Sequence, residues 1–260
     1  MIYVLRFARI ALYTVFWCVP AMLVAPFSGE AIVWIGRTWL SWIFRACGLR
    51  VEVGGLEHID RTQPYVIMSN HQSVLDIGAL VLTLPVSWRF VAKRELTWVP
   101  FFGWALGLSD QIVIDRGNRA KSVRSLARAA ERVRRGLNVI IFPEGTRSPT
   151  GEMREFKSGG FHLAIQAQVP ILPATVSGSH ELIPKRSLAI HSGTIKVVYG
   201  APIPTRGMRP EQRNELKGLV RDAITRGYDP AFQKAPAGVC VDAETGASPV
   251  RAPSSMRPSA

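Results

Sequence analysis

Residues 65–84 read YVIMSNHQSVLDIGALVLTL, and this stretch changes character twice. The apolar run at 65–68 is typical of a buried strand, a polar turn follows, and residues 73–84 carry apolar side chains at helical spacing. Further strand-like runs lie at 88–92, 111–115, 138–142, 171–176 and 194–199, and further helical patterns at 118–135, 159–168 and 210–226. Strands that alternate with helices predict an α/β fold, with a mixed, largely parallel sheet covered by helices.

The first 48 residues differ from this pattern. Residues 10–27 contain no charge, and residues 31–47 place Trp34, Trp39 and Trp42 among aliphatic residues and arginines. Tryptophan and arginine together favour the boundary between membrane and water. A signal peptide is the alternative, but the apolar stretch is longer than the usual signal core, and no polar mature start follows it. We therefore predict two membrane-associated helices in residues 1–48, and the sequence leaves open whether they span the bilayer or dip into it.

Two further segments follow. In residues 49–229, strand-like and helix-like patterns alternate, as in a soluble domain. Residues 230–260 are rich in proline, alanine, serine and glycine, and this composition predicts a disordered tail.

The chain is strongly basic, with 32 Lys and Arg against 19 Asp and Glu, a formal net charge of +13. Basic proteins bind anionic partners such as nucleic acid, anionic lipid or a phosphorylated substrate. Nucleic acid is disfavoured, because the sequence has no zinc-finger spacing and no RNP-type aromatic motif. Cys18, Cys47 and Cys240 lie far apart, which argues against a disulfide framework and a zinc site. We predict no metal centre.

His71 and Asp76 are the first candidates for chemistry. Residues five positions apart differ by about 140° around a helix, so these two cannot share a helix face. They can meet if His71 lies in the turn before a helix that begins near Ser73, and Asp76 then orients His71 as a general base. The structural alternative is that Asn70 or Ser73 caps the helix and Asp76 complements its dipole. The spacing leaves both readings open. Ser73 is a weak candidate nucleophile, because no G-x-S-x-G motif occurs.

A second polar loop follows the strand-like run in NVIIFPEGTRS, residues 138–148. Glycine allows a tight turn, Thr and Ser hydroxyls can donate to oxyanions, and Arg147 carries a forked cation suited to phosphate. Ligands of open α/β sheets bind beyond the carboxyl ends of the strands. The loop and His71 therefore point to one site.

The two motifs together, N-H-x4-D at 70–76 and F-P-E-G-T-R-S at 142–148, resemble the defining blocks of the 1-acyl-sn-glycerol-3-phosphate (lysophosphatidic acid) acyltransferases. Other stretches resemble further blocks of that family in the same order, namely AKRELTWVPFFGW at 92–104, IVIDR at 112–116, FKSGGFHLA at 156–164 and VPILP at 169–173. The resemblance runs over roughly residues 50–205. The motif pair is specific for the glycerolipid acyltransferase superfamily and less specific for the substrate.

The resemblance implies the glycerolipid acyltransferase fold and a defined reaction. A fatty acyl group would move from acyl-CoA or acyl-carrier protein, a co-substrate used without a further cofactor, to the sn-2 hydroxyl of 1-acyl-sn-glycerol 3-phosphate, giving phosphatidate. His71 would take the proton of that hydroxyl, and Asp76 would orient His71. The implied phosphate-binding residues are Arg116, Glu144, Gly145, Thr146, Arg147 and Lys93.

The resemblance also implies a location and leaves alternatives. The N-terminal helices would dock on the inner (cytoplasmic) membrane, with the catalytic domain facing the cytoplasm. Within the superfamily the acceptor could instead be glycerol 3-phosphate, a lyso-ornithine lipid or another lysophospholipid. A non-catalytic peripheral membrane protein is the alternative from a different class.

Overall fold

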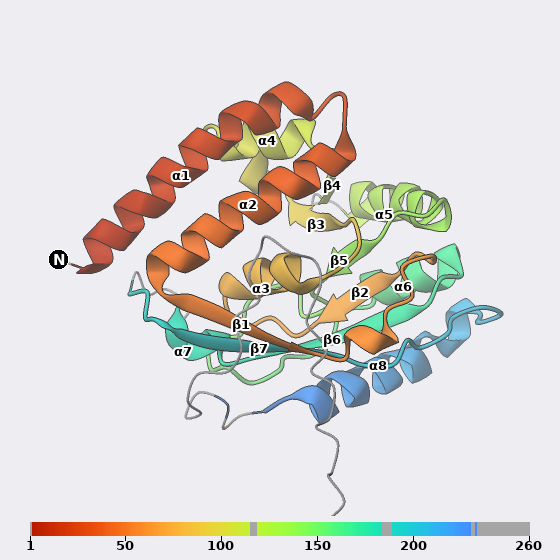
Figure 1. Ribbon diagram of the computed structural model, residues 1–260. Coiled ribbons are helices and arrows are strands. Elements are labelled where there is room, and N and C mark those ends of the chain that lie inside the picture. The colour runs from red at the N-terminus through yellow and green to blue at the C-terminus, as the bar shows by residue number, and fades with distance from the viewer. Residues whose placement is uncertain (1, 115–118, 184–188, 230–231, 233–260) are drawn as a thin grey trace, which may run out of the picture.

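The computed structural model describes residues 2–114, 119–183, 189–229 and 232. Its strands form one seven-stranded sheet in the order β1-β7-β6-β2-β5-β3-β4 (Figure 1). The strands are β1 (Leu49–Gly54), β2 (Val66–Ser69), β3 (Arg89–Lys93), β4 (Ile112–Ile114), β5 (Val139–Ile141), β6 (Ile171–Ser177) and β7 (Gly193–Tyr199). Every neighbouring pair is parallel except β6 and β7, which are antiparallel. The predicted mixed, largely parallel sheet is confirmed.

The helices match the predicted α/β alternation, with additions. They are α1 (Ile2–Val24), α2 (Gly29–Cys47), α3 (Leu75–Thr83), α4 (Phe102–Leu108), α5 (Arg119–Arg134), α6 (Gly159–Ala167), α7 (Ser179–Leu182) and α8 (Arg213–Gly227), with 3-10 turns η1 (Leu56–His58), η2 (Arg94–Trp98) and η3 (Pro210–Gln212). The sequence patterns did not reveal β1, α4 or α7. Strand β1 pairs with β7, whose residues lie more than a hundred positions away, so local periodicity does not specify it.

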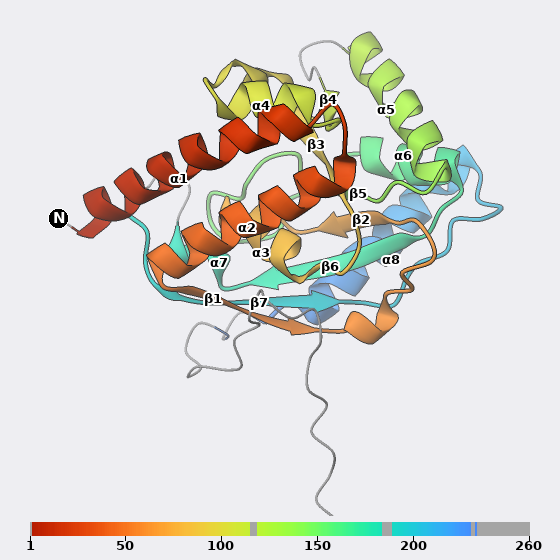
Figure 2. The same ribbon diagram turned by 45° about the horizontal axis from the view of Figure 1, so that its top comes forward.

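Helices cover both faces of the sheet (Figures 1 and 2). Successive strand side chains point to opposite faces, so Ile67 and Ile140 join the core beneath α2 and α3. Their neighbours Val66 and Met68 join the second core, beneath α5, α6 and α8. Burial on both faces accounts for the uninterrupted apolar runs in the central strands.

The two N-terminal helices pack differently. Helix α2 belongs to the domain, because its Val33, Ile43 and Phe44 are buried in the same core as the sheet. Helix α1 rests on α2 and α4 and is otherwise largely exposed (Figure 2). Within the described residues, its segment Tyr3–Val24 is the one helix whose length and composition would suffice to cross a membrane. Nearly all of the predicted tail, 230–260, lies outside the described residues.

Four neighbouring strands bring the candidate site together. Strands β6, β2, β5 and β3 are adjacent and parallel, so their carboxyl ends meet at one edge of the sheet. The chain leaves that edge into Ser179 after β6, His71 after β2, residues 142–148 after β5 and Lys93 at the end of β3. This edge is where α/β folds bind ligands.

Candidate active site

His71 lies in the turn between β2 and α3, five residues before Asp76, and the two side chains meet. The Nδ1 atom of His71 is 2.9 Å from Oδ2 of Asp76. The imidazole also stacks on the ring of Phe142, with 4.0 Å between ring centroids and 19° between ring planes. The histidine is thereby fixed on two sides, and it helps to line a cavity.

The Asp76 carboxylate is fully buried and accepts hydrogen bonds from several donors. Besides His71, the backbone N–H groups of Gln72 and Ser73 donate to Oδ2 at 2.6 and 2.9 Å, and the hydroxyl of Ser179 donates to Oδ1. Asp76 therefore satisfies the N–H groups before α3 and also holds the histidine. The same carboxylate thus contacts the histidine, as the catalytic interpretation predicts, and lies at the start of the helix, as the structural alternative predicts.

Neither Ser73 nor Asn70 caps α3. The buried hydroxyl of Ser73 donates to the carbonyl of Ile183 at 3.0 Å, and no side chain caps the start of α3. The amide of Asn70 instead clamps β2 to β6: its Nδ2 donates to the carbonyl of Val176, and its Oδ1 accepts from the N–H of Val176, each at 2.8 Å. This clamp fixes the residue that precedes His71.

Ser179 is the site residue that sequence reasoning missed. It lies 103 positions after Asp76, at the start of α7, and is completely buried. Gly178 before it has a φ of 89°, which lets the chain turn sharply at the end of β6. The available sequence signal was S-G-S directly after a predicted buried strand, at the sheet edge that carries His71.

The loop after β5 holds the backbone of His71 from both sides. The N–H of His71 donates to Oε1 of Glu144 at 2.7 Å, and the N–H of Ser148 donates to the carbonyl of His71 at 2.8 Å. The second oxygen of Glu144 accepts the N–H of Arg154 at 3.0 Å. Two of these hydrogen bonds join the two sequence motifs, and the third holds Glu144 to Arg154.

The expected contact of Glu144 with the acceptor phosphate stays a prediction, and the structure shows both carboxylate oxygens of Glu144 bonded within the protein. The side chain is 2% exposed, both of its oxygens accept backbone N–H groups, and a carboxylate beside a phosphate would repel it. Burial raises the pKa of Glu144 above its ordinary value, while the N–H groups of Arg154 and His71 oppose that rise. Glu144 therefore holds the turn that contains His71 in place.

Four of the remaining candidates belong to the cavity wall. Gly145, Thr146, Arg147 and Lys93 line the same cavity as His71. Gly145 has a φ of 74°, a conformation that glycine adopts without strain, and this turn carries the chain to Thr146 and Arg147. The ammonium of Lys93 pairs with Glu95 at 2.9 Å near the surface. Arg116 lies outside the described residues.

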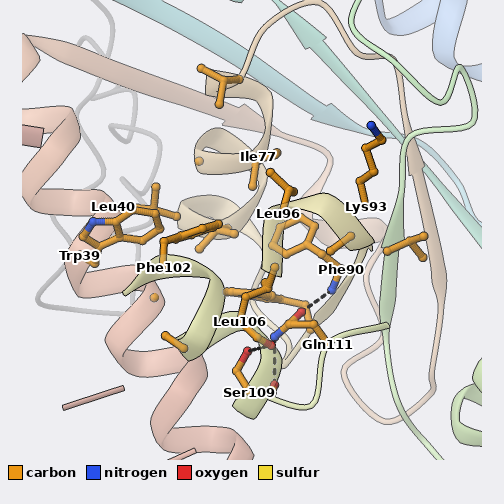
Figure 3. A pocket seen from close by; sticks show the side chains of 18 of the residues that line it. Trp39, Leu40, Ile77, Phe90, Lys93, Leu96, Phe102, Leu106, Ser109 and Gln111 are labelled. Atoms are coloured by element: carbon orange, nitrogen blue, oxygen red, sulfur yellow. Dashed lines mark hydrogen bonds between the residues drawn. The ribbon is translucent and has the colours of Figure 1, made fainter. Parts of the chain in front are cut away.

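The rest of the cavity wall is largely apolar, and the cavity has a volume of about 510 Å³, which is in the range of small-molecule sites. Figure 3 shows Trp39, Leu40, Ile77, Phe90, Leu96, Phe102 and Leu106 around it, with Lys93 to one side. The polar groups in this wall bond to the chain, since Gln111 Oε1 accepts the N–H of Phe90 at 2.7 Å and the Ser109 hydroxyl donates to the Leu106 carbonyl at 3.0 Å. The cavity suits an amphiphile with an anionic head and an apolar chain.

Comparison with known proteins places this geometry in a family. Residues 50–177 match the Acyltransferase family. Among curated proteins, the chain is 42% identical over 178 residues to 1-acyl-sn-glycerol-3-phosphate acyltransferase of Pseudomonas aeruginosa, covering 67% of this chain and 68% of that protein. It is 39% identical over 178 residues to 1-acyl-sn-glycerol-3-phosphate acyltransferase alpha of Homo sapiens, covering 68% of this chain. The matched segment spans 63% of the human protein's length.

A solved structure shares the fold. The crystal structure of the 1-acyl-sn-glycerophosphate (LPA) acyltransferase PlsC from Thermotoga maritima superimposes with a TM-score of 0.75 and 25% identity. The match covers 87% of this chain and 92% of that one. Because the family match, the sequence identity to these relatives and the shared fold agree, the chain belongs to the 1-acyl-sn-glycerol-3-phosphate acyltransferase family of enzymes.

Proposed function

We propose that this protein transfers a fatty acyl group from a thioester donor, acyl-CoA or acyl-carrier protein, to the sn-2 hydroxyl of 1-acyl-sn-glycerol 3-phosphate, giving phosphatidate. One observation carries the proposal. An imidazole held by a buried carboxylate, 2.9 Å from it, lines a largely apolar cavity that Arg147 and Lys93 also line. Such a site has a base for a hydroxyl, cations for a phosphate and room for an alkyl chain.

In the reaction we propose, His71 Nε2 accepts the proton of the acceptor hydroxyl while that oxygen attacks the thioester carbonyl. The C–O bond forms, the C–S bond breaks, and the proton passes from the imidazolium to the leaving thiolate, so a free thiol is released. Asp76 holds the imidazole and stabilises its charged form during the reaction. Both substrates must be bound together, because no acyl-enzyme is formed.

The proposed supporting roles follow from the contacts. Ser179 fixes the second oxygen of Asp76, and Glu144 fixes the backbone of His71. We assign the acceptor phosphate to the other residues predicted for it, led by Arg147, whose planar guanidinium can make two parallel hydrogen bonds to one phosphate. Those residues are Lys93, Gly145, Thr146, Arg147 and Arg116.

We further propose that the protein works at the inner membrane with its catalytic domain on the cytoplasmic side. Helix α1 supplies the apolar length, and the acceptor is a membrane lipid. The proposed reaction uses no cofactor beyond its thioester co-substrate. An acyl chain in the apolar cavity would lie beside α2 and α3, whose Trp39, Leu40 and Ile77 form part of the wall.

The test is direct. Purified full-length protein is incubated with labelled acyl-CoA or acyl-carrier protein and one acceptor at a time: lysophosphatidate, glycerol 3-phosphate, lyso-ornithine lipid or lysophosphatidylcholine. We expect labelled phosphatidate from lysophosphatidate, and none from the His71→Ala variant. Preferred labelling of another acceptor would reassign the substrate. Labelling of none, with a folded protein and both donors, would favour a non-catalytic lipid-binding role.

A further inference from the structure

The segment 96–108, which contains most of η2 and all of α4, is apolar on both of its sides. Residues 96–109 read LTWVPFFGWALGLS and contain no charge. The inner side, including Leu96, Phe102 and Leu106, lines the cavity. The outer side is exposed, with Trp98 at 68% and Trp104 at 53%. A helix that is apolar all round belongs in a protein core or in a membrane.

The exposed side continues the apolar surface of α1. Helix α4 packs against α1, and the two lie next to each other in both ribbon views (Figures 1 and 2). Among the described residues, all exposed large hydrophobic side chains lie in residues 1–47 or 96–108 except Leu56, Val74 and Leu219. Patches of this kind mark interaction sites. Most of the exposed apolar side chains therefore lie on the N-terminal helices and on the 96–108 segment, and α4 of that segment contacts α1.

The ends of the segment are charged. Lys93, Arg94 and Glu95 precede it and Asp110 follows it, and all four are exposed. An uncharged stretch of this length is too short to span a bilayer and is typical of interfacial segments. Tryptophan is favoured at the lipid boundary, and lysine and arginine side chains reach from there to the headgroups. These features fit a lipid surface better than a protein partner.

We propose that the 96–108 segment is a third membrane-inserting element, which dips into the bilayer beside α1. Its exposed residues in the lipid would be Trp98, Val99, Phe101, Trp104 and Leu108. Because the same segment forms a wall of the cavity behind His71, this insertion brings the cavity wall into contact with the lipid layer. The inference rests on the proposed function in one respect only: the enzyme would take its lipid substrate from the membrane.

Fluorescence quenching in vesicles tests the insertion. Full-length protein is bound to phosphatidylcholine–phosphatidylglycerol vesicles with brominated acyl chains, and native protein is compared with a Trp98→Phe/Trp104→Phe variant. We expect brominated chains to quench the emission of Trp98 and Trp104 in native protein. The variant should therefore lose mainly the quenched part of the emission. The matched control is Trp88→Phe, which removes a core tryptophan that is 5% exposed and should remove unquenched emission.

Two results would overturn the proposal. Quenching of the Trp98 and Trp104 emission by aqueous iodide, but not by brominated chains, would leave the segment in water. Resistance to both quenchers would mean that protein, for example a second copy of the chain, covers it.

An independent measurement is vesicle affinity. Replacing both tryptophans with serine should weaken binding at least about tenfold, because each buries a large apolar area. Leu219→Ser, on α8 at the other face of the sheet and 45% exposed, should leave binding unchanged. Equal binding of the two variants would contradict insertion. Acyl transfer in detergent micelles is followed in parallel, so loss of the proposed function is distinguished from loss of insertion.

Discussion

Ser179→Ala isolates the support of the catalytic pair without touching the cavity. In the native protein the buried Asp76 carboxylate accepts from His71, from two backbone N–H groups and from the Ser179 hydroxyl. The variant removes the hydroxyl and leaves Oδ1 without that donor. Ser179 does not line the cavity, so substrate binding should be unaffected.

The expected size follows from the strength of such a bond. A hydrogen bond to a charged group contributes about 1.5–3 kcal/mol, and each 1.4 kcal/mol corresponds to about a factor of ten in rate. If Asp76 shifts in the variant, the imidazolium loses alignment as it forms. We expect kcat for Ser179→Ala to fall by about 10- to 100-fold, with KM for both substrates nearly unchanged.

Ser177→Ala is the matched control. Ser177, the last residue of β6, is also a buried serine, but its hydroxyl accepts the N–H of Asp229 at 3.0 Å and is not among the donors to Asp76. It should lose about 0.5–1.5 kcal/mol of stability and keep native kcat. Steady-state rates of both variants are measured at a temperature where each is folded by circular dichroism. Equal kcat for the two variants would refute the positioning role of Ser179.

Further substitutions test the other assignments. His71→Ala should lower turnover about 10²–10⁴-fold, because the acceptor hydroxyl loses its base. Ser73→Ala should keep most of its turnover, because its hydroxyl is bonded to the Ile183 carbonyl; an acyl ester trapped on Ser73 would contradict this. Arg147→Ala should lower kcat/KM for the phosphorylated acceptor at least about tenfold, since a charged contact contributes about 1.5–3 kcal/mol; unchanged acceptor kinetics would remove it from the phosphate site. Burial raises the pKa of Glu144, so its contribution to stability is complete below the unfolded-state pKa of about 4.3 and is lost as pH rises through the folded-state pKa. The free energy of unfolding in urea should therefore fall more steeply with pH, from about pH 4 upward, for native protein than for Glu144→Gln, and equal slopes would rule out this burial effect.

The central strands and the two motifs could be predicted because their information is local. Val139–Ile141 is apolar on both faces, and the helical spacing in residues 73–84 is visible without a partner. The N-H-x4-D spacing also limited the geometry, since His71 and Asp76 could meet only if a turn lay between them. The structure has that turn, with α3 beginning at Leu75.

Membership of α2 in the core was not evident from the sequence. Its tryptophans and arginines indicated a membrane helix, and Trp34 and Trp42 are indeed exposed. Its other side, with Ile43 and Phe44, packs on the domain, and the ring of Phe44 lies against Gly78 of α3 so closely that a Cβ there would be 2.4 Å from it. A sequence pattern shows that a side is apolar but not whether lipid or protein covers it.

By itself, the sequence determined the α/β class, the family and the His71–Asp76 pair proposed as the base and its carboxylate, because each depends on residue type and short spacing. Only the tertiary structure decided how the site is held. Parallel pairing of β2 with β5 and β6 brings Glu144 and Ser179, 73 and 103 positions from their partners His71 and Asp76, into contact with them. Glu144 became a brace and Ser179 a donor because strand order sets which loops share an edge, and strand order depends on contacts that no local pattern encodes.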